Sequence, residues 1–265
     1  MLLGLAPPLP PRSRPVRDVI LATTTSVRDA GLLEALLPRF EAVTGYRVRV
    51  IAVGSGQAMA LGRRGEADVF ILHDPAGEEQ FVTDGYGIDR RLLMHNEFLL
   101  VGPPGDPAKA RGTDVVRAFR AIARTQSAFV SRDDRSGTNV RELSLWHAAG
   151  IELSGSWYRE SGQGMGATLL IADQLGAYTL TDVATFLNHH YPLQLDVICE
   201  GDSLLRNVYH VIRANPDRFA RVNVAGALAF ADYMISDSTQ RLIGEFRRAE
   251  LGRSIFVPDA IADSR

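Results

Sequence analysis

Four short loops rich in hydroxyl groups or glycine carry the residues best suited to chemistry in this sequence. Each follows a predicted strand or turn and comes directly before a predicted helix. They are residues 23–26, 54–57, 131–138 and 161–166. The first N–H groups of a helix have no partners within it, and with the aligned peptide dipoles they attract anions. The four loops therefore indicate a site for a small oxyanion.

The residue types in the loops favour a fully deprotonated dianion such as sulfate, molybdate or tungstate. Glycine lets the backbone approach a ligand closely, and Ser and Thr hydroxyls donate without adding charge. Arg132 would supply part of the countercharge and a planar fork for two oxygens. A phosphate that keeps a proton would also need an acceptor. Asp133 and Asp134 in the third loop could accept, so phosphate stays open as a second ligand class.

A Ser or Thr before a helix is more often a plain helix cap than a ligand, and this interpretation applies to each loop taken alone. Thr23 and Thr138 are the strongest candidates for simple capping or turn formation. The order of the loops, two in each of two predicted lobes, favours the anion site over four separate caps.

Short apolar segments alternate with helical patterns from Asp18 onward, which predicts an α/β fold with parallel strands. We expect residues 18–101 and 213–265 to form one lobe and residues 104–208 the other, with crossings near 101–104 and 208–213. Residues 1–17, with five prolines among residues 7–15, read as a flexible arm or as the remnant of an export signal.

Composition excludes several classes of protein. The 29 Lys and Arg against 31 Asp and Glu give a net charge of −2, without the basic excess of a nucleic-acid-binding protein. Cys199 is the only cysteine, so neither an internal disulfide nor a cysteine-built metal site can form. The histidines lack metal-ligand spacing, and no apolar run is long enough to cross a membrane. The sequence predicts no cofactor, no cation site and no catalytic residue.

The sequence resembles the tungstate-binding proteins of ABC importers from about Val19 to Pro258. The segments that carry the resemblance include LATTTSVRDAGLLEALL, VGSGQA, FVSRDDRSGT and ESGQGMGATLLIADQLGAYTLTD. The resemblance implies a two-lobed periplasmic-binding-protein-like fold of type II, with two crossover strands and a ligand cleft between the lobes. It also implies a periplasmic or extracellular protein that acts as a monomer, is not an enzyme, and delivers tungstate or molybdate to a membrane permease.

Carried onto matching positions, the family's binding loops give nine expected ligand residues. These are Thr25, Ser26, Ser55, Arg132, Ser136, Thr138, Gly164, Met165 and Gly166. The chain departs from the family pattern S-R-G-D-D-S-G-T at two places, where Asp133 replaces a Gly and Arg135 replaces the second Asp, and in the next position Asn139 stands where His is common. We expect Asp133 to need a left-handed backbone, and Arg135 either to pair with Asp133 or Asp134 or to add a second cation to the site.

Two alternatives belong to other classes of function. A cytoplasmic oxyanion-sensing domain would share the binding site but not the permease. A transferase on the same fold could use Cys199 to hold a cofactor, although the sequence offers no acid–base constellation beside it.

Overall fold

The computed structural model describes residues 17–189 and 192–260, and the expected N-terminal arm lies outside them except for Arg17. Strands and helices alternate along most of the described chain, as predicted for an α/β protein. The elements, in chain order, are β1 (Arg17–Thr24), α1 (Thr25–Asp29), α2 (Leu32–Thr44), β2 (Tyr46–Val53), α3 (Ser55–Arg63), β3 (Val69–Leu72), α4 (Pro75–Thr83), β4 (Gly87–Gly102), α5 (Val115–Thr125), β5 (Phe129–Ser131), α6 (Gly137–Ala149), β6 (Tyr158–Glu160), α7 (Met165–Leu175), β7 (Thr179–Asp182), α8 (Val183–Leu187), β8 (Asp196–Cys199), the 3₁₀ helix η1 (Ser203–Leu205), β9 (Arg206–Ala214), α9 (Val224–Ile235), α10 (Asp237–Glu245), α11 (Arg248–Leu251) and β10 (Val257–Pro258).

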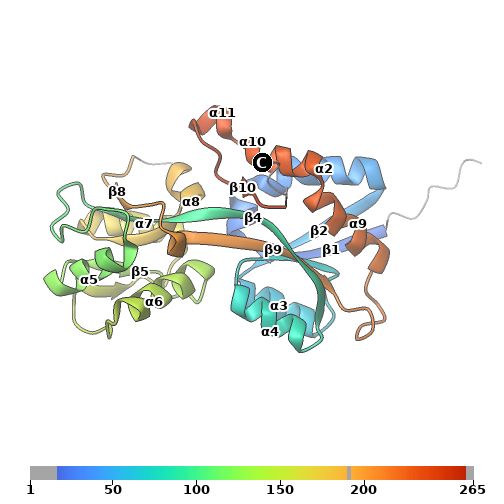
Figure 1. The fold of residues 1–265 in the computed structure, drawn as a ribbon, viewed down its shortest axis with the longest axis horizontal. Helices are drawn as coiled ribbons and strands as arrows, with labels where there is room; N and C mark the ends of the chain where they lie inside the picture. The colour runs from blue at the N-terminus through green and yellow to red at the C-terminus, as the bar shows by residue number, and fades with distance from the viewer. Residues whose placement is uncertain (1–16, 190–191, 261–265) are drawn as a thin grey trace, which may run out of the picture.

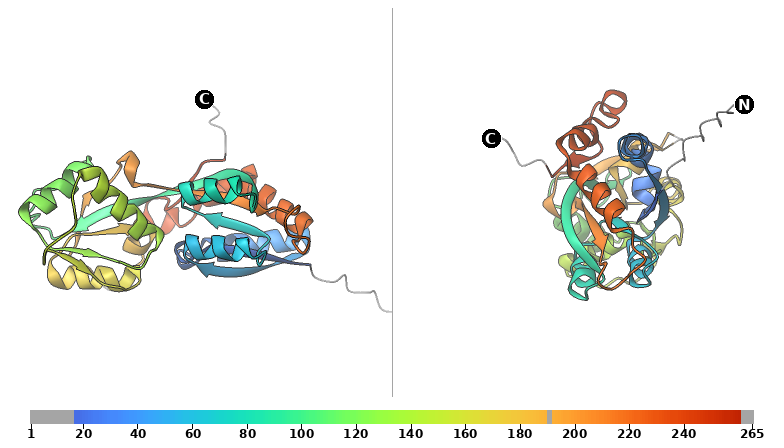
Figure 2. Two further views of the ribbon diagram at one scale, coloured as in Figure 1. Left: turned by 90° about the horizontal axis from the view of Figure 1, so that it is seen from below. Right: turned by 90° about the vertical axis from the view of Figure 1, so that its right-hand side faces the viewer.

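The chain forms two bodies that lie side by side, and the long strands β4 and β9 run from one to the other (Figure 1). We call the first the terminal body, because it is built from the two ends of the described chain: β1–β3, α1–α4, α9–α11 and β10. The second, the central body, holds α5–α8 and β5–β8. A view from below shows the same two bodies and the same connection (Figure 2).

Pairing of the strands explains how β4 belongs to both bodies. In the terminal body the hydrogen-bonded order is β10-β4-β9-β3-β1-β2, with β1 parallel to β2 and β3. The first part of β4, from Gly87 to Glu97, pairs antiparallel with β9. Its last part, from Phe98 to Gly102, pairs antiparallel with β7 and β8 in the central body. The two bodies are therefore joined by continuous strands rather than by loose linkers.

The apolar cores show how each body is stabilised. One cluster fills the terminal body around Phe70 and Phe81, and another fills the central body around Trp146 and Phe119. The largest cluster extends from Phe40 across β4 and β9 to residues of the central body such as Leu169. Burial of apolar surface favours folding by roughly 25 cal/mol per Å², so this shared core also holds the crossing strands in place.

Local signals explain where α2 packs and where it ends. Leu32, Leu33, Leu36 and Phe40 lie on its buried face, and Pro38 lies inside the helix without ending it. Gly45 ends the helix with φ of 72°, a left-handed conformation that favours glycine.

The main difference from the sequence prediction is the length of β4. The sequence predicts a strand only from Glu97 to Val101, whereas β4 begins at Gly87. No helix among residues 17–189 and 192–260 is long and apolar enough to cross a membrane.

Candidate functional site

A cavity of about 730 Å³ lies where the starts of five helices meet. Most of its lining residues come from the beginnings of α1, α3, α7 and α8 and from the loop before α6, and the rest from the end of α1 and the end of β2. They are Thr25, Ser26, Asp29, Ala52, Val53, Gly54, Gly56, Gln57, Arg132, Asp134, Arg135, Ser136, Gly164, Met165, Asp182 and Thr185. Both bodies contribute, so the structure brings all four predicted loops to one cleft.

Most of these helix starts are not capped by a side chain. Thr24 before α1, Gly54 before α3 and Gly164 before α7 make no side-chain hydrogen bond to the first turn. Ser136, before α6, acts as a cap, accepting from Asn139 N at 3.3 Å, and Asp182 caps α8. The plain-cap interpretation therefore holds for Ser136 and not for the other three loops. Their first-turn N–H groups remain donors for a ligand.

The first loop is tied to the strand that crosses between the bodies. Thr23, the first residue of this loop, is buried, and its hydroxyl donates to Ile71 O at 3.0 Å. The Ser26 hydroxyl lies 3.1 Å from Thr24 Oγ1 and 3.3 Å from the Tyr209 hydroxyl on β9. Thr25 and Ser26 both line the cavity, as predicted.

Tyr209 belongs to a chain of hydrogen bonds along the crossing strands. Asn207 Nδ2 donates to the Tyr209 hydroxyl at 2.9 Å and to Asn96 Oδ1 at 2.8 Å. His73 Nδ1 lies 2.8 Å from Asn207 Oδ1, and burial lowers the pKa of His73, which favours a neutral ring that donates there. A Cβ built on Gly137 of the central body would lie 2.0 Å from His73 Cε1, so the two bodies approach closely at this point.

The second loop supplies a buried hydroxyl without a partner. Ser55 is 5% exposed, and its Oγ makes no hydrogen bond with the described residues. Ser55 does not line the main cavity; it lines a smaller neighbouring one of about 420 Å³, which Gly56 and Arg135 also border. An unpaired buried hydroxyl is costly, so Ser55 is a candidate donor to a ligand.

The third loop carries the charged residues of the site. Arg132 forms an ion pair with Asp134, and the two side chains are 13% and 24% exposed. The Arg132 Nε is buried and has no hydrogen-bond partner among the described residues. Asp133 has φ of 46°, the left-handed conformation expected from the family's glycine, and Arg135 has φ of 58°.

The expected ion pair of Arg135 with Asp133 or Asp134 is not found. Among the described residues no carboxylate lies within ion-pair distance of Arg135, which is exposed at the border of both cavities. Its backbone N donates to Asn139 Oδ1 at 3.1 Å. The prediction of a surface ion pair is therefore wrong, because the one neighbouring acid in an ion pair, Asp134, is held by Arg132.

A buried carboxylate supports this loop from behind. Glu142 on α6 accepts from Ser131 Oγ at 2.6 Å, Trp146 Nε1 at 3.0 Å and the Tyr158 hydroxyl at 2.8 Å. Ser131 Oγ in turn accepts from Asn139 Nδ2 and Asp133 N, each at 3.3 Å. Burial raises the pKa of Glu142, and the hydrogen bonds oppose the rise.

The fourth loop turns at Gly162, with φ of 61°, and presents the start of α7. Ser161 Oγ lies 2.9 Å from Thr168 Oγ1, which fixes the loop to the helix. Gly164 and Met165 line the main cavity, whereas Gly166 lines an adjacent cavity of about 620 Å³.

Six of the nine predicted ligand residues thus line the main cavity, and three do not. The six are Thr25, Ser26, Arg132, Ser136, Gly164 and Met165. Ser55 and Gly166 border neighbouring cavities, and Thr138 is buried in the first turn of α6.

The sequence reasoning missed Asp182 and Thr185. Asp182 is buried and accepts from Thr185 N at 2.8 Å and Thr185 Oγ1 at 2.6 Å, so it caps α8. The signal was present, because an Asp before an apolar helical segment, here Val183–Leu187, is a typical N-cap. Both oxygens of Asp182 are occupied by α8, which reduces its repulsion of an anion in the cleft.

Cys199 does not line the cleft. It is buried in the central core, and burial raises the pKa of its thiol to about 11, helped by Asp202 and Asp114. A thiol is a poor nucleophile until it is deprotonated, so the site offers no support for a transferase that uses Cys199. Among residues 17–189 and 192–260 no group of three His, Cys, Asp or Glu side chains is placed to hold a metal ion.

Comparisons with known proteins agree with this geometry. The model of a family described as a PBP superfamily domain matches residues 10–238. The tungstate-binding protein TupA of Peptoclostridium acidaminophilum is 45% identical over 246 residues, which are 92% of this chain and 86% of the relative. A putative ABC transporter anion-binding protein of Haloferax volcanii is 43% identical over 94% of this chain and 74% of its own.

A solved structure extends the agreement to three dimensions. The tungstate-binding protein TupA from Desulfovibrio alaskensis superposes with a TM-score of 0.84 at 37% identity, covering 92% of this chain and 99% of the other. The predicted periplasmic-binding-protein-like fold with two lobes is confirmed.

Proposed function

We propose that this chain, which belongs to the PBP superfamily and within it to the tungstate-binding proteins of ABC importers, captures tungstate, with molybdate a close second, and delivers it to a membrane permease. The proposal describes a solute-binding protein rather than an enzyme. In it, the protein works as a monomer in the periplasm or outside the cell.

One observation carries the proposal: a cleft between two bodies is bordered by uncapped helix starts and by one part-buried Arg132. Such a site offers many neutral donors and few free acceptors. A tetrahedral dianion needs donors on every oxygen, whereas a protonated phosphate needs a free acceptor as well. The three acids in the cavity lining are already engaged, Asp182 by α8, Asp134 by Arg132 and Asp29 by Arg28.

The proposed ligand residues are those of the four loops. Thr25, Ser26, Ser55, Ser136 and Thr138 would donate through hydroxyl or backbone N–H groups, and Gly164, Met165 and Gly166 through the backbone at the start of α7. Arg132 would be the charged ligand. Its buried, unpartnered Nε supports this role, since an unpaired buried donor is costly without a ligand.

Binding would close the two bodies over the anion. A cavity of about 730 Å³ is in the range that accommodates organic ligands, and it exceeds what a four-oxygen anion fills. We propose residues 18–101 with 213–265 and residues 104–208 as the two moving lobes, with β4 and β9 as the hinge. Closure would shrink the cavity and bring Ser55, which now lies beside it, toward the ligand.

Calorimetric titration of anion-free protein with tungstate, molybdate, sulfate and phosphate tests the proposal. We expect tight binding of tungstate and molybdate, with sulfate much weaker and phosphate silent at a pH where it keeps a proton. The absence of binding for all four anions would refute an oxyanion site. Tight phosphate binding without tungstate binding would show that Asp134 serves as an acceptor and that the ligand class is wrong.

A further inference from the structure

Arg132 forms an ion pair with an acid of its own loop, which a simple anion site does not need. The guanidinium that would bind the dianion is already paired with a carboxylate, that of Asp134. Asp134 is well held in this position, because its Oδ1 also accepts from Ser136 N at 3.1 Å. A ligand anion and Asp134 therefore compete for one cation.

Leaving Asp134 in place beside a bound dianion would be unfavourable. Like charges a few ångströms apart repel, and the repulsion grows as closure removes water. Arg132 cannot offer its full fork to the ligand while one of its terminal nitrogens serves Asp134. Asp134 must then move or be neutralised when the anion binds.

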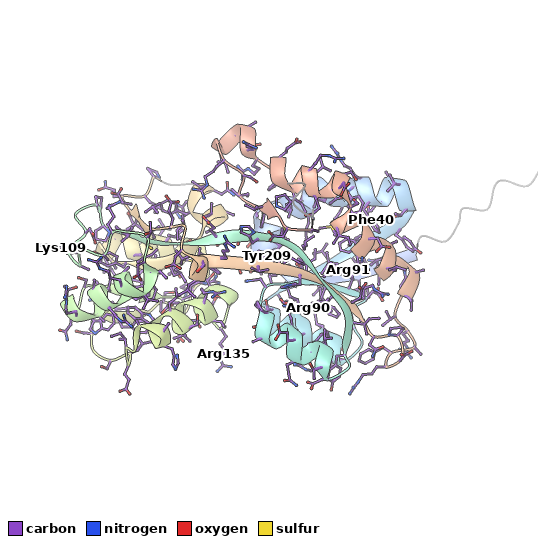
Figure 3. The ribbon with its side chains drawn as sticks, viewed as in Figure 1. Phe40, Arg90, Arg91, Lys109, Arg135 and Tyr209 are labelled. Atoms are coloured by element: carbon purple, nitrogen blue, oxygen red, sulfur yellow. The ribbon has the colours of Figure 1, made fainter. Side chains whose placement is uncertain are left out.

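The residue next along the chain is suited to receive it. Arg135 is exposed, has no carboxylate within ion-pair distance among the described residues, and borders the main cavity and the neighbouring one. Figure 3 shows it projecting from the central body at the start of α6. A free guanidinium adjacent to Asp134 offers the same bidentate geometry that Arg132 offers.

We propose that Asp134 occupies Arg132 as an internal substitute for the ligand, and that Arg135 takes over Asp134 when the oxyanion binds. The inference rests on the proposed function, since it concerns binding of an oxyanion at the same cleft. In this exchange Asp134 lowers the affinity for the oxyanion because it competes for Arg132. Arg135 reduces that competition by pairing with Asp134. It also keeps Arg132 paired in the ligand-free protein, where an unpaired part-buried cation would be costly.

Asp134→Asn is the direct test, because the amide keeps an oxygen for Ser136 N and loses the charge. Tungstate titration should show a dissociation constant roughly three- to tenfold lower than that of the unmodified protein. Asp133→Asn is the matched control: it removes the same charge from the neighbouring residue, which is exposed and forms no ion pair among the described residues. Equal effects of the two variants would contradict a specific competition between Asp134 and the ligand, because the loss of one negative charge near the site would then account for both.

A double-mutant cycle tests the role of Arg135. Arg135→Gln should raise the dissociation constant roughly three- to tenfold in the unmodified background and less than about twofold in the Asp134→Asn background. An equal loss in both backgrounds would overturn the exchange and make Arg135 a direct ligand. Thermal unfolding without ligand confirms that each variant is folded.

The proposed function and the exchange fail in different ways. If the unmodified protein binds neither tungstate nor molybdate, the function is wrong and the exchange falls with it. If the unmodified protein binds tungstate and Asp134→Asn binds it no more tightly, only the exchange is wrong.

Discussion

The two halves of the cleft contribute different kinds of ligand groups. The terminal body contributes mainly neutral groups, the hydroxyls of Thr25 and Ser26 and the backbone around Gly54 and Gly56; its one acid in the lining, Asp29, forms an ion pair with Arg28. The central body contributes the cations Arg132 and Arg135, with Asp134 between them in sequence. Neutral donors arranged around four oxygens distinguish a tetrahedral dianion by shape, whereas charge sets most of the attraction. We therefore expect affinity to depend mainly on the central body and shape recognition on the terminal body.

The two halves also differ in what holds them. Ser26 is connected through Tyr209 and Asn207 to His73, along the strands that cross between the bodies. The Arg132 loop is held instead by Glu142, inside the core of the central body. The first connection would change on closure, because it runs along the hinge, whereas the second would move as a rigid unit.

Arg132→Ala should have the largest effect on the affinity for tungstate. A small effect would contradict the division of roles between the two bodies. Removal of the charged partner of a buried dianion costs about 2–5 kcal/mol, so we expect a rise in the tungstate dissociation constant of roughly 30-fold or more. Arg132→Lys should recover part of the loss, since it keeps the charge without the fork. Calorimetry measures both, with Arg117→Ala, an exposed arginine on α5, as the control. A loss below threefold would place the main attraction in the terminal body.

Glu142→Ala should have the next largest effect, on stability rather than on affinity alone. Three buried donors, from Ser131, Trp146 and Tyr158, would lose their acceptor at about 1–3 kcal/mol each before relaxation. We expect the midpoint of thermal unfolding to fall by about 5–10 °C, and tungstate binding to weaken as the loop loosens. Glu142→Gln should restore most of the stability, because its amide oxygen can still accept from Trp146 and Tyr158. An unchanged midpoint for the alanine variant would show that the loop does not depend on this carboxylate.

The loops of the site could be predicted from sequence because each carries its own local signal. Hydroxyls and glycines before an apolar helical pattern mark a helix start, and α3, α6 and α7 begin within or directly after the loops that predict them. Which loop residues line the cavity could be predicted only in part, because six of the nine expected residues do so. Ser55 borders a neighbouring cavity and Thr138 is buried in the first turn of α6, because helix geometry and packing, rather than residue type, set their positions.

The long strand β4 was missed because its first half reads as polar. Asp89, Arg90 and Arg91 interrupt the apolar alternation that marks a strand. In the structure Arg91 pairs with Asp232 at 2.6 Å, and Asp89 pairs with Arg213 at 2.8 Å. Arg90 pairs with Glu78, 12 residues away, but the partners Asp232 and Arg213 lie more than 100 residues away, and no local pattern can reveal them.

Tyr209→Phe should have a smaller effect, confined to the terminal half of the site. It removes the hydroxyl that contacts Ser26, while Asn207 keeps its bond to Asn96. One hydrogen bond of this kind contributes about 0.5–1.5 kcal/mol, so we expect the tungstate dissociation constant to rise roughly two- to tenfold. The effect should add to that of Glu142→Gln, because the two networks share no partner. Strong non-additivity in calorimetry would contradict the separation of the two halves.

The smallest expected effect is a pH dependence of stability that belongs to the central body. Burial raises the pKa of Glu142 above its ordinary value of 4.5, so between these two values the folded protein binds a proton that the unfolded chain has lost. The contribution of this group to stability is therefore complete below pH 4.5 and is lost as the pH rises through the raised pKa. Glu142→Gln cannot titrate, so the unfolding midpoint of the unmodified protein minus that of the variant should decrease from acid toward neutral pH. Taking the difference cancels the other titrating groups, such as His73 between β3 and α4. A difference that grew with pH would mean that the hydrogen bonds from Ser131, Trp146 and Tyr158 outweigh the effect of burial and keep Glu142 ionised. The Arg132 loop would then be supported by a buried negative charge.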